Sequence, residues 1–447
     1  MSASRRRVVI TGLGVATPIG IGMNAFWDGL LEKRCGIRRV ESFDPSGMPC
    51  AIAGELPSFQ LSDFIPKSYR KSVKVMSRDI TLAVVCAYHA VVDAGLHTKC
   101  IIERGEASGP PNVDSARFGA NIGAGLVCAD LNELAGALNT AADEQGRFDL
   151  RRWGAEGMNN LTPLWLLKFL PNMLACHVTI VHDAQGPSNT ITCAEASSHL
   201  AIGEAYRTIA RGDEDVCICG GAESKINPMS MTRPAIWGRL NTRDNQSPQS
   251  ASRPFASDRC GMVPSEGGGL VILEALDHAR ARNARIYAEL AGLGAGANTV
   301  NWSSPDPKGR GIAVALRKAI ADAAGTVEQI DLVVPSGAAT PEHDAAEMAA
   351  WNEVFGARLE QVPAFTTRGA LGHNGAGSGA IDFAATVMAL YRNTVPPSLN
   401  TSNADRASRF RFVQDDPKDA RVRQAISLGY ALAGGQSAAL VIKRFEE

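Results

Sequence analysis

Short runs of uninterrupted apolar residues recur along this 447-residue chain, and they constrain its fold more than any other feature. A strand that is apolar on both faces is typical of a sheet covered by helices on both sides. Helical patterns separate several of these runs, so the sequence predicts an α/β fold. The expected strands lie at residues 8–11, 117–125, 188–193, 215–219, 268–275, 285–294, 329–335 and 426–430.

An internal echo is the second informative feature. The run Gly14–Pro18 (Gly-Val-Ala-Thr-Pro) returns as Gly337–Pro341 (Gly-Ala-Ala-Thr-Pro), each time after an expected buried strand. Self-similarity of this kind is typical of duplicated units, although five residues also recur by chance in a chain rich in glycine and alanine. The echo points to a duplicated strand-and-turn unit without deciding the matter.

Charge and cysteine usage exclude several classes of protein. Lys and Arg number 45 against 46 Asp and Glu, a net charge of −1, so no overall positive field favours nucleic-acid binding. The ten cysteines show no paired Cys-x-x-Cys spacing, which argues against structural zinc. Most lie in apolar surroundings, as expected of reduced cysteines in a cytoplasmic protein. No 18-residue apolar run predicts a membrane-spanning helix.

Several short motifs follow one another in a fixed order: Gly186–Gly203, Gly220–Glu223, Ser252–Phe255 and Ser265–Gly269. Together they resemble the β-ketoacyl-acyl-carrier-protein synthases of the elongating type, which are condensing enzymes. The resemblance implies a thiolase-like α/β fold, built from two similar α-β-α-β-α halves with buried mixed sheets. It divides the chain into a half with the nucleophile elbow, residues 1–279, and a half with the histidine loops, residues 280–447. Neither a cofactor nor a metal ion is expected.

The nucleophile position of such enzymes holds a cysteine at the start of a buried helix. The spacing that the resemblance implies, seven residues on from Ser188 and seven back from Ile202, reaches Glu195 in both cases. A carboxylate cannot serve as the ordinary acyl acceptor, because the product would be an easily hydrolysed anhydride. We therefore expect no condensing activity, with Glu195 either capping the helix start or playing a chemical role of its own. Cys193 lies two residues earlier and could be the nucleophile only if the alignment shifted in compensating ways on both sides of it. It is otherwise expected to be a buried strand residue.

The resemblance also implies two histidines and a lysine near the nucleophile. Ser336 stands at the first histidine position, and a serine hydroxyl does not titrate near neutrality. His343, seven residues later, is expected on the solvated surface. The second histidine is present as His373, either as a functional residue or as a buried structural one. Arg368 replaces the lysine and, as a hypothesis, pairs with Glu195.

A gate to the acyl pocket and a basic surface complete the expected site. The family's gate phenylalanine falls within Tyr430–Gly435, so that Leu432 or Ala433 stands at the gate and the aromatic ring is gone. Lys71 and Lys74 lie near the positions that dock carrier protein in the resembling enzymes. A basic run of this kind is otherwise a solvated face.

With these catalytic positions changed and the framework kept, the chain resembles the chain-length factors of polyketide and aryl-polyene systems. Those proteins lack the cysteine and pair with an active ketosynthase. Those proteins usually carry glutamine, not glutamate, at the nucleophile position. We expect a heterodimer with an active ketosynthase, or a homodimer, through the segment Asn172–Thr192, and possible contact with acyl carrier protein in fatty acid or polyketide elongation. Two alternatives stay open: a malonyl-carrier-protein decarboxylase, and a divergent active synthase that uses Cys193.

Overall fold

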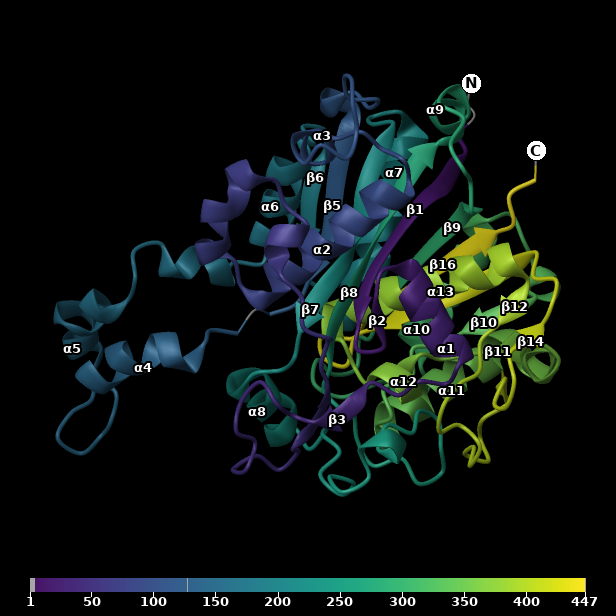
Figure 1. Cartoon of the computed structure of the whole chain (residues 1–447). Helices are drawn as coiled ribbons and strands as arrows, with labels where there is room; N and C mark the ends of the chain where they lie inside the picture. Colours follow the sequence, from purple (N-terminus) through teal and green to yellow (C-terminus); the bar gives the residue numbers. More distant parts are fainter. Residues whose placement is uncertain (1–4, 127, 447) are drawn as a thin grey trace.

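A single mixed sheet forms the centre of the molecule (Figure 1). The computed structural model describes residues 5–126 and 128–446. Twelve strands join in the order β13-β11-β10-β15-β16-β9-β1-β8-β7-β5-β6, with β2 paired to β1. Helices cover the sheet, so the expected α/β fold is confirmed.

The strands are β1 (Val8–Thr17), β2 (Gly20–Ile21), β3 (Ile37–Arg39), β4 (Ile52–Gly54), β5 (Phe118–Ala124), β6 (Ser188–Ile191), β7 (Val216–Ser224), β8 (Glu266–Ala275), β9 (Ala288–Ala297), β10 (Leu332–Val334), β11 (Pro363–Ala364), β12 (Thr394–Val395), β13 (Arg411–Phe412), β14 (Lys418–Asp419), β15 (Gln424–Tyr430) and β16 (Gln436–Lys443). The α-helices are α1 (Met23–Leu31), α2 (Arg78–Asp93), α3 (Lys99–Glu103), α4 (Leu131–Thr140), α5 (Leu150–Ala155), α6 (Met173–His182), α7 (Ser197–Arg211), α8 (Pro228–Ile236), α9 (Leu276–Ala281), α10 (Arg310–Asp322), α11 (Pro341–Phe355), α12 (Arg368–Leu371) and α13 (Ser378–Arg392).

Two halves of the sheet repeat one topology. The order β6-β5-β7-β8-β1 matches the order β11-β10-β15-β16-β9. In each half the first two pairings are parallel and the last two antiparallel. The expected pair of similar halves is thus confirmed, with one refinement. The halves form one continuous sheet because Val8–Ile10 of β1 pairs with both β8 and β9. The division of the chain at residue 279 stays a prediction.

The sequence echo does not coincide with this structural repeat. By position in the sheet, β1 corresponds to β9, whereas the run Gly337–Pro341 follows β10, the counterpart of β5. The match between Gly14–Pro18 and Gly337–Pro341 is therefore a coincidence. The equivalent segments are Gly12-Leu13-Gly14 in β1 and Gly292-Leu293-Gly294 in β9.

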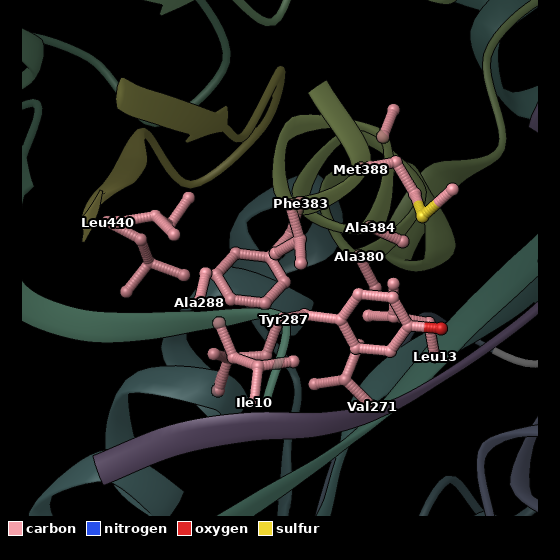
Figure 2. Packing of buried hydrophobic residues seen from close by; sticks show 14 of the residues in the cluster. Ile10, Leu13, Val271, Tyr287, Ala288, Ala380, Phe383, Ala384, Met388 and Leu440 are labelled. Atoms are coloured by element: carbon pink, nitrogen blue, oxygen red, sulfur yellow. The ribbon is translucent and has the colours of Figure 1, made fainter. Parts of the chain in front are cut away.

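Five layers follow from the burial of both sheet faces. One hydrophobic cluster places α7 and α13 between the two halves of the sheet, against inward residues such as Val271 and Leu440. Figure 2 shows Phe383, Ala384 and Met388 of this inner layer. A second cluster packs α2 and α6 on the outer face of the first half, and a third packs α10 and α11 on the outer face of the second. Strands buried on both sides explain the uninterrupted apolar runs.

Glycines let the outer helices approach the strands very closely. A Cβ on Gly14 of β1 would lie 2.1 Å from the carbonyl oxygen of Cys86 in α2. A Cβ on Gly294 of β9 would lie 2.0 Å from the carbonyl oxygen of Ala315 in α10. The two halves therefore use the same device to pack a helix on a strand.

An arm formed by residues 128–169, with α4 and α5, projects from the body beside α6 (Figure 1). Its exposed large hydrophobic residues are Leu131, Leu138, Phe148, Leu150, Met158, Leu164 and Leu166. Such a surface is unusual for a free monomer. Over the described residues, no helix combines the length and apolarity needed to cross a membrane.

Candidate active site

Glu195 lies at a sharp turn between β6 and α7. The turn is the 3-10 helix η6 (Ala194–Ala196), and Ala194 adopts a left-handed conformation with φ of 47°. The Ser197 hydroxyl secures the turn by accepting a hydrogen bond from the backbone N–H of Cys193 at 2.8 Å. The side chain of Glu195 is consequently turned inward, where only 6% of the residue is exposed.

The second half of the molecule repeats this turn. The 3-10 helix η10 (Gly375–Gly377) precedes α13, and Gly375 has φ of 56°. The Ser378 hydroxyl accepts a hydrogen bond from the backbone N–H of Asn374 at 3.0 Å. The two turns contact each other, so the beginnings of two buried helices meet at the site.

A backbone donor and the nearby Lys225 hold Glu195 in its charged form at neutral pH. The N–H of Leu432 donates to Glu195 Oε2 at 2.9 Å. Burial by itself would raise the pKa of Glu195, but the side chains of His373 and Lys225 and the Leu432 N–H outweigh it and lower that pKa below its usual value. Glu195 is therefore a carboxylate at neutral pH, bound to the loop that contains the expected gate.

Lys225 is a residue that sequence reasoning missed. Its Nζ lies 2.6 Å from Glu223 Oε1, and Glu223 Oε2 accepts the N–H of Ala376 at 2.6 Å. Burial would favour the neutral amine, but the carboxylates of Glu223 and Glu195 outweigh this and raise the pKa of Lys225. The glycine-rich motif that ends at Glu223 was the only signal for it in the sequence.

His373 lies beside Glu195 and is 3% exposed. Its Nδ1 has no hydrogen-bond partner among the described residues. Burial lowers the pKa of His373 to about 4, although the Glu195 carboxylate opposes this change. The imidazole is therefore neutral near pH 7.

Ser336 lies outside the cavity at Glu195, whereas His343 contacts a residue that lines it. The backbone N–H of Ser336 donates to Glu347 Oε1 at 2.7 Å, and Ser336 does not line the cavity at Glu195. His343 was expected on the solvated surface, and that expectation is wrong. His343 is only 4% exposed. It lies in the first turn of α11, which packs against the loop that contains Leu432, so that its Nε2 is 3.0 Å from the Leu432 carbonyl oxygen.

The hypothesis that Arg368 pairs with Glu195 is also wrong. Arg368 forms a buried ion pair with Asp382 of α13, and its Nη1 donates to Thr367 Oγ1 at 2.7 Å. The helix α13 begins just after the His373 loop and places Asp382 next to α12. A carboxylate of the neighbouring helix thus neutralises Arg368, and Glu195 relies on Lys225.

Cys193 was otherwise expected to be a buried strand residue, and that expectation is wrong: β6 ends at Ile191, and Cys193 lies half-buried immediately before the turn. Burial raises the pKa of its thiol, which disfavours the nucleophilic thiolate. It does not line the cavity at Glu195. The environment of Cys193 therefore lacks the features that activate a cysteine.

A cavity of about 200 Å³ opens in front of Glu195. Both residues considered for the gate line it, Leu432 and Ala433. No aromatic ring stands at either position. The cavity is lined by Leu126, Ala194, Glu195, Lys225, Ser230, Arg233, Pro234, Trp237, Arg239, Met262, Leu432 and Ala433.

Lys71 and Lys74 lie on the 3-10 helix η2 (Lys67–Val75) and do not line this cavity. Both are exposed. Neither forms an ion pair with another residue in the described part of the chain, so both charges face solvent. In residues 5–126 and 128–446, no group of His, Cys, Asp and Glu side chains is arranged to hold a metal ion.

Comparison with known proteins gives consistent matches over the whole chain. A family model described as the β-ketoacyl synthase N-terminal domain matches residues 5–279, and the model of the C-terminal domain matches residues 287–402. The 3-oxoacyl-[acyl-carrier-protein] synthase 2 of Synechocystis is 32% identical over 443 residues, which cover 99% of each chain. A putative polyketide β-ketoacyl synthase 1 of Streptomyces halstedii is 32% identical over 440 residues, 98% of each chain. The solved structure of the ishigamide ketosynthase/chain length factor matches with a TM-score of 0.82 and 26% identity, over 99% of this chain and 100% of that one.

Proposed function

The chain belongs to the β-ketoacyl synthase family, and on that premise we propose that it is a non-condensing, chain-length-factor-like subunit that assembles with an active ketosynthase. The observation that carries the proposal is the state of Glu195. Glu195 is an ionised carboxylate bound to the Leu432 N–H, and by the expected alignment it takes the place where a condensing enzyme needs a thiolate. The same carboxylate takes up a backbone donor that could otherwise stabilise a developing oxyanion.

The surrounding residues support the same conclusion. Ser336 supplies no imidazole, and its backbone is bound to Glu347. The neutral His373 is the one residue of the expected catalytic set that keeps its chemical type. A charged Glu195 also disfavours malonyl decarboxylation, since that reaction would bring the substrate carboxylate next to Glu195 itself, which would repel it.

The arm supports assembly with a second subunit. Its apolar side chains extend over both α4 and α5 and the segment that leads to α6. Next to it, β6 is the last strand of the sheet, and Ser188 and Asn189 are exposed. An exposed strand edge next to an apolar surface suits a large obligate interface. The solved relative named as a ketosynthase/chain length factor makes an active ketosynthase the partner to test first.

The exposed charges of Lys71 and Lys74 support contact with acyl carrier protein, because carrier proteins are acidic. The proposed contact is electrostatic and should therefore weaken as the salt concentration rises.

Intact-mass analysis with acyl- and malonyl-carrier protein, together with measurement of carbon dioxide release, tests the proposal. The isolated chain should give neither an acyl adduct nor carbon dioxide. Together with an active ketosynthase it should support condensation, and the product distribution should change when this chain is omitted. An adduct on Cys193 would instead establish an active synthase. Carbon dioxide without an adduct would establish a decarboxylase.

A matched pair of variants sharpens the test. Glu195→Cys should accept an acyl group at residue 195, because the turn at the helix start still stabilises a thiolate. It should not condense, because Ser336 provides no imidazole. Cys193→Ser should behave as the wild type in both assays. Full condensation by Glu195→Cys alone would contradict the role given to Ser336.

A further inference from the structure

Two arginines in the cavity at Glu195 form no ion pair with a carboxylate in residues 5–126 and 128–446. Arg233 of α8 forms neither an ion pair nor a side-chain hydrogen bond within the described part of the chain. Arg239 donates one hydrogen bond, from Nη2 to the carbonyl oxygen of Ser303, and likewise has no ion pair there. Both are half-buried and both line the cavity.

The charges around the cavity do not balance. Lys225 is matched by Glu223, so among the lining residues only the carboxylate of Glu195 remains against Arg233 and Arg239. Glu342, outside the cavity lining, also acts on Arg239. Burial lowers the pKa of Arg239, and neighbouring acidic groups offset this only in part. A guanidinium that loses water without gaining a counter-ion costs free energy. An anion bound at the two arginines would recover that cost.

Apart from Ser230, the rest of the cavity wall is apolar. Pro234, Trp237, Met262 and Leu432 contribute to it, and the ring of Trp237 lies beneath the Arg239 guanidinium, 5.5 Å away. The cavity measures about 200 Å³, compared with roughly 150 Å³ for an engineered protein cavity that binds benzene. The space therefore suits one small ring or short chain with a polar head.

We propose that this cavity binds a small organic carboxylate, with its carboxylate at Arg233 and Arg239 and its apolar body against Trp237 and Met262. A singly charged head fits better than a doubly charged one, because Glu195 lines the same space and would repel excess negative charge. The site goes beyond the proposed subunit role, since it requires neither a carrier protein nor a partner. Failure of one proposal therefore leaves the other intact.

The proposal is tested by titrating the isolated full chain with benzoate. Calorimetry and tryptophan fluorescence measure the binding. Benzamide, with the same ring and no charge, is the matched neutral probe. Inorganic phosphate is the anion without an apolar body. Benzoate should bind at least about tenfold more tightly than benzamide, because charge-assisted hydrogen bonds to guanidinium are lost in the neutral probe. Equal binding of the two, or phosphate binding without benzoate binding, would overturn the proposal.

Variants locate the site. Arg233→Gln and Arg239→Gln should each weaken benzoate binding by about tenfold, whereas Arg411→Gln, which removes an exposed charge on β13 outside the cavity, should not. Glu195→Gln removes the opposing charge and should tighten benzoate binding by at least about threefold. This gain cannot arise from misfolding, so it tests the site even if an arginine variant fails to fold. Unchanged affinity in Glu195→Gln together with both arginine variants would refute the site.

Discussion

At the scale of single residues, the turn before α7 carries a strain that its counterpart avoids. The second half of the molecule has Gly375 where the first has Ala194, and both positions have positive φ. An L-residue in this conformation costs about 1–2 kcal/mol. The hydrogen bond of Ser197 to the Cys193 N–H helps to hold the strained turn, which fixes the direction of Glu195.

Replacement of Ala194 by glycine tests this strain. Relief of strain and added chain entropy oppose each other, so Ala194→Gly should leave the free energy of unfolding unchanged or raise it by up to about 1 kcal/mol. Ala345→Gly, at an exposed site within α11, should lower it by about 1 kcal/mol. Urea unfolding of both variants measures the difference. Equal losses in the two would show that the turn is unstrained.

His182 gives the residue scale a pH dependence. Burial lowers its pKa to about 3, and its Nδ1 hydrogen-bonds with Thr98 Oγ1 at 2.9 Å. Between that pKa and the unfolded value of about 6.5, only the unfolded chain binds the proton. Stability therefore rises with pH across this window, by up to about 1.4 kcal/mol per pH unit. In His182→Gln this contribution should vanish when unfolding is measured from pH 4 to 7, and an unaltered slope would rule it out.

At the scale of elements, glycines on strands decide how closely the outer helices pack. Gly14 and Gly294 occupy equivalent places on β1 and β9, beneath α2 and α10. The short spacing leaves no room for a methyl group. The Gly-Leu-Gly pair at residues 12–14 and 292–294 was present in the sequence as the true mark of duplication. It was not recognised there, because glycine patterns acquire meaning only when the helix above each strand is known.

A single methyl group at this contact should be costly. Gly294→Ala should lower the free energy of unfolding by about 3 kcal/mol or more, because backbone atoms of α10 must move. Gly47→Ala, where a Cβ meets nothing within 4 Å, is the matched control and should be neutral. Thermal unfolding distinguishes them, and similar melting temperatures would contradict the close packing of α10 on β9.

The assignment of Glu195, Leu432 and Ala433 to the nucleophile and gate positions stays a prediction. Sequence reasoning singled out these residues from spacing along short segments, and the structure brings all three to one cavity. Sequence reasoning failed where two distant segments meet. His343 is buried only because α11 packs beneath Leu432, and Arg368 finds Asp382 only once α13 lies beside α12. Lys225 looked like any loop lysine until Glu223 and Glu195 surrounded it.

At the scale of the whole molecule, the arm is the feature that a free monomer explains least. The arm projects from the body, and its large apolar side chains are exposed to solvent rather than packed in a hydrophobic core. Leu150 is 73% exposed at the first position of α5, after the capping residue Asp149. Burial against a second subunit would give these side chains a role.

Charge placed on the arm should therefore prevent assembly without unfolding the chain. We expect Leu150→Glu with Leu166→Glu to reduce self-association, or association with an active ketosynthase, by at least about tenfold, because a glutamate would lose water at an apolar interface. The melting temperature should hold, since glutamate suits the start of a helix. Val314→Glu, on the exposed side of α10, is the control. Sedimentation velocity measures the association of each variant. If the arm variant associates as strongly as the wild type, the arm is not part of the interface.

The shared position of β1 has a consequence for the order of events during synthesis. Ala16 pairs with Gly268 of β8, 252 positions further along the chain, and Val8 pairs with Leu290 of β9. At roughly 5–20 residues per second, the first strand leaves the ribosome tens of seconds before either neighbour exists. During that interval its unpaired backbone edges and its apolar faces are open to wrong partners. A nascent chain of this kind should depend on chaperones until about two-thirds of it has been made.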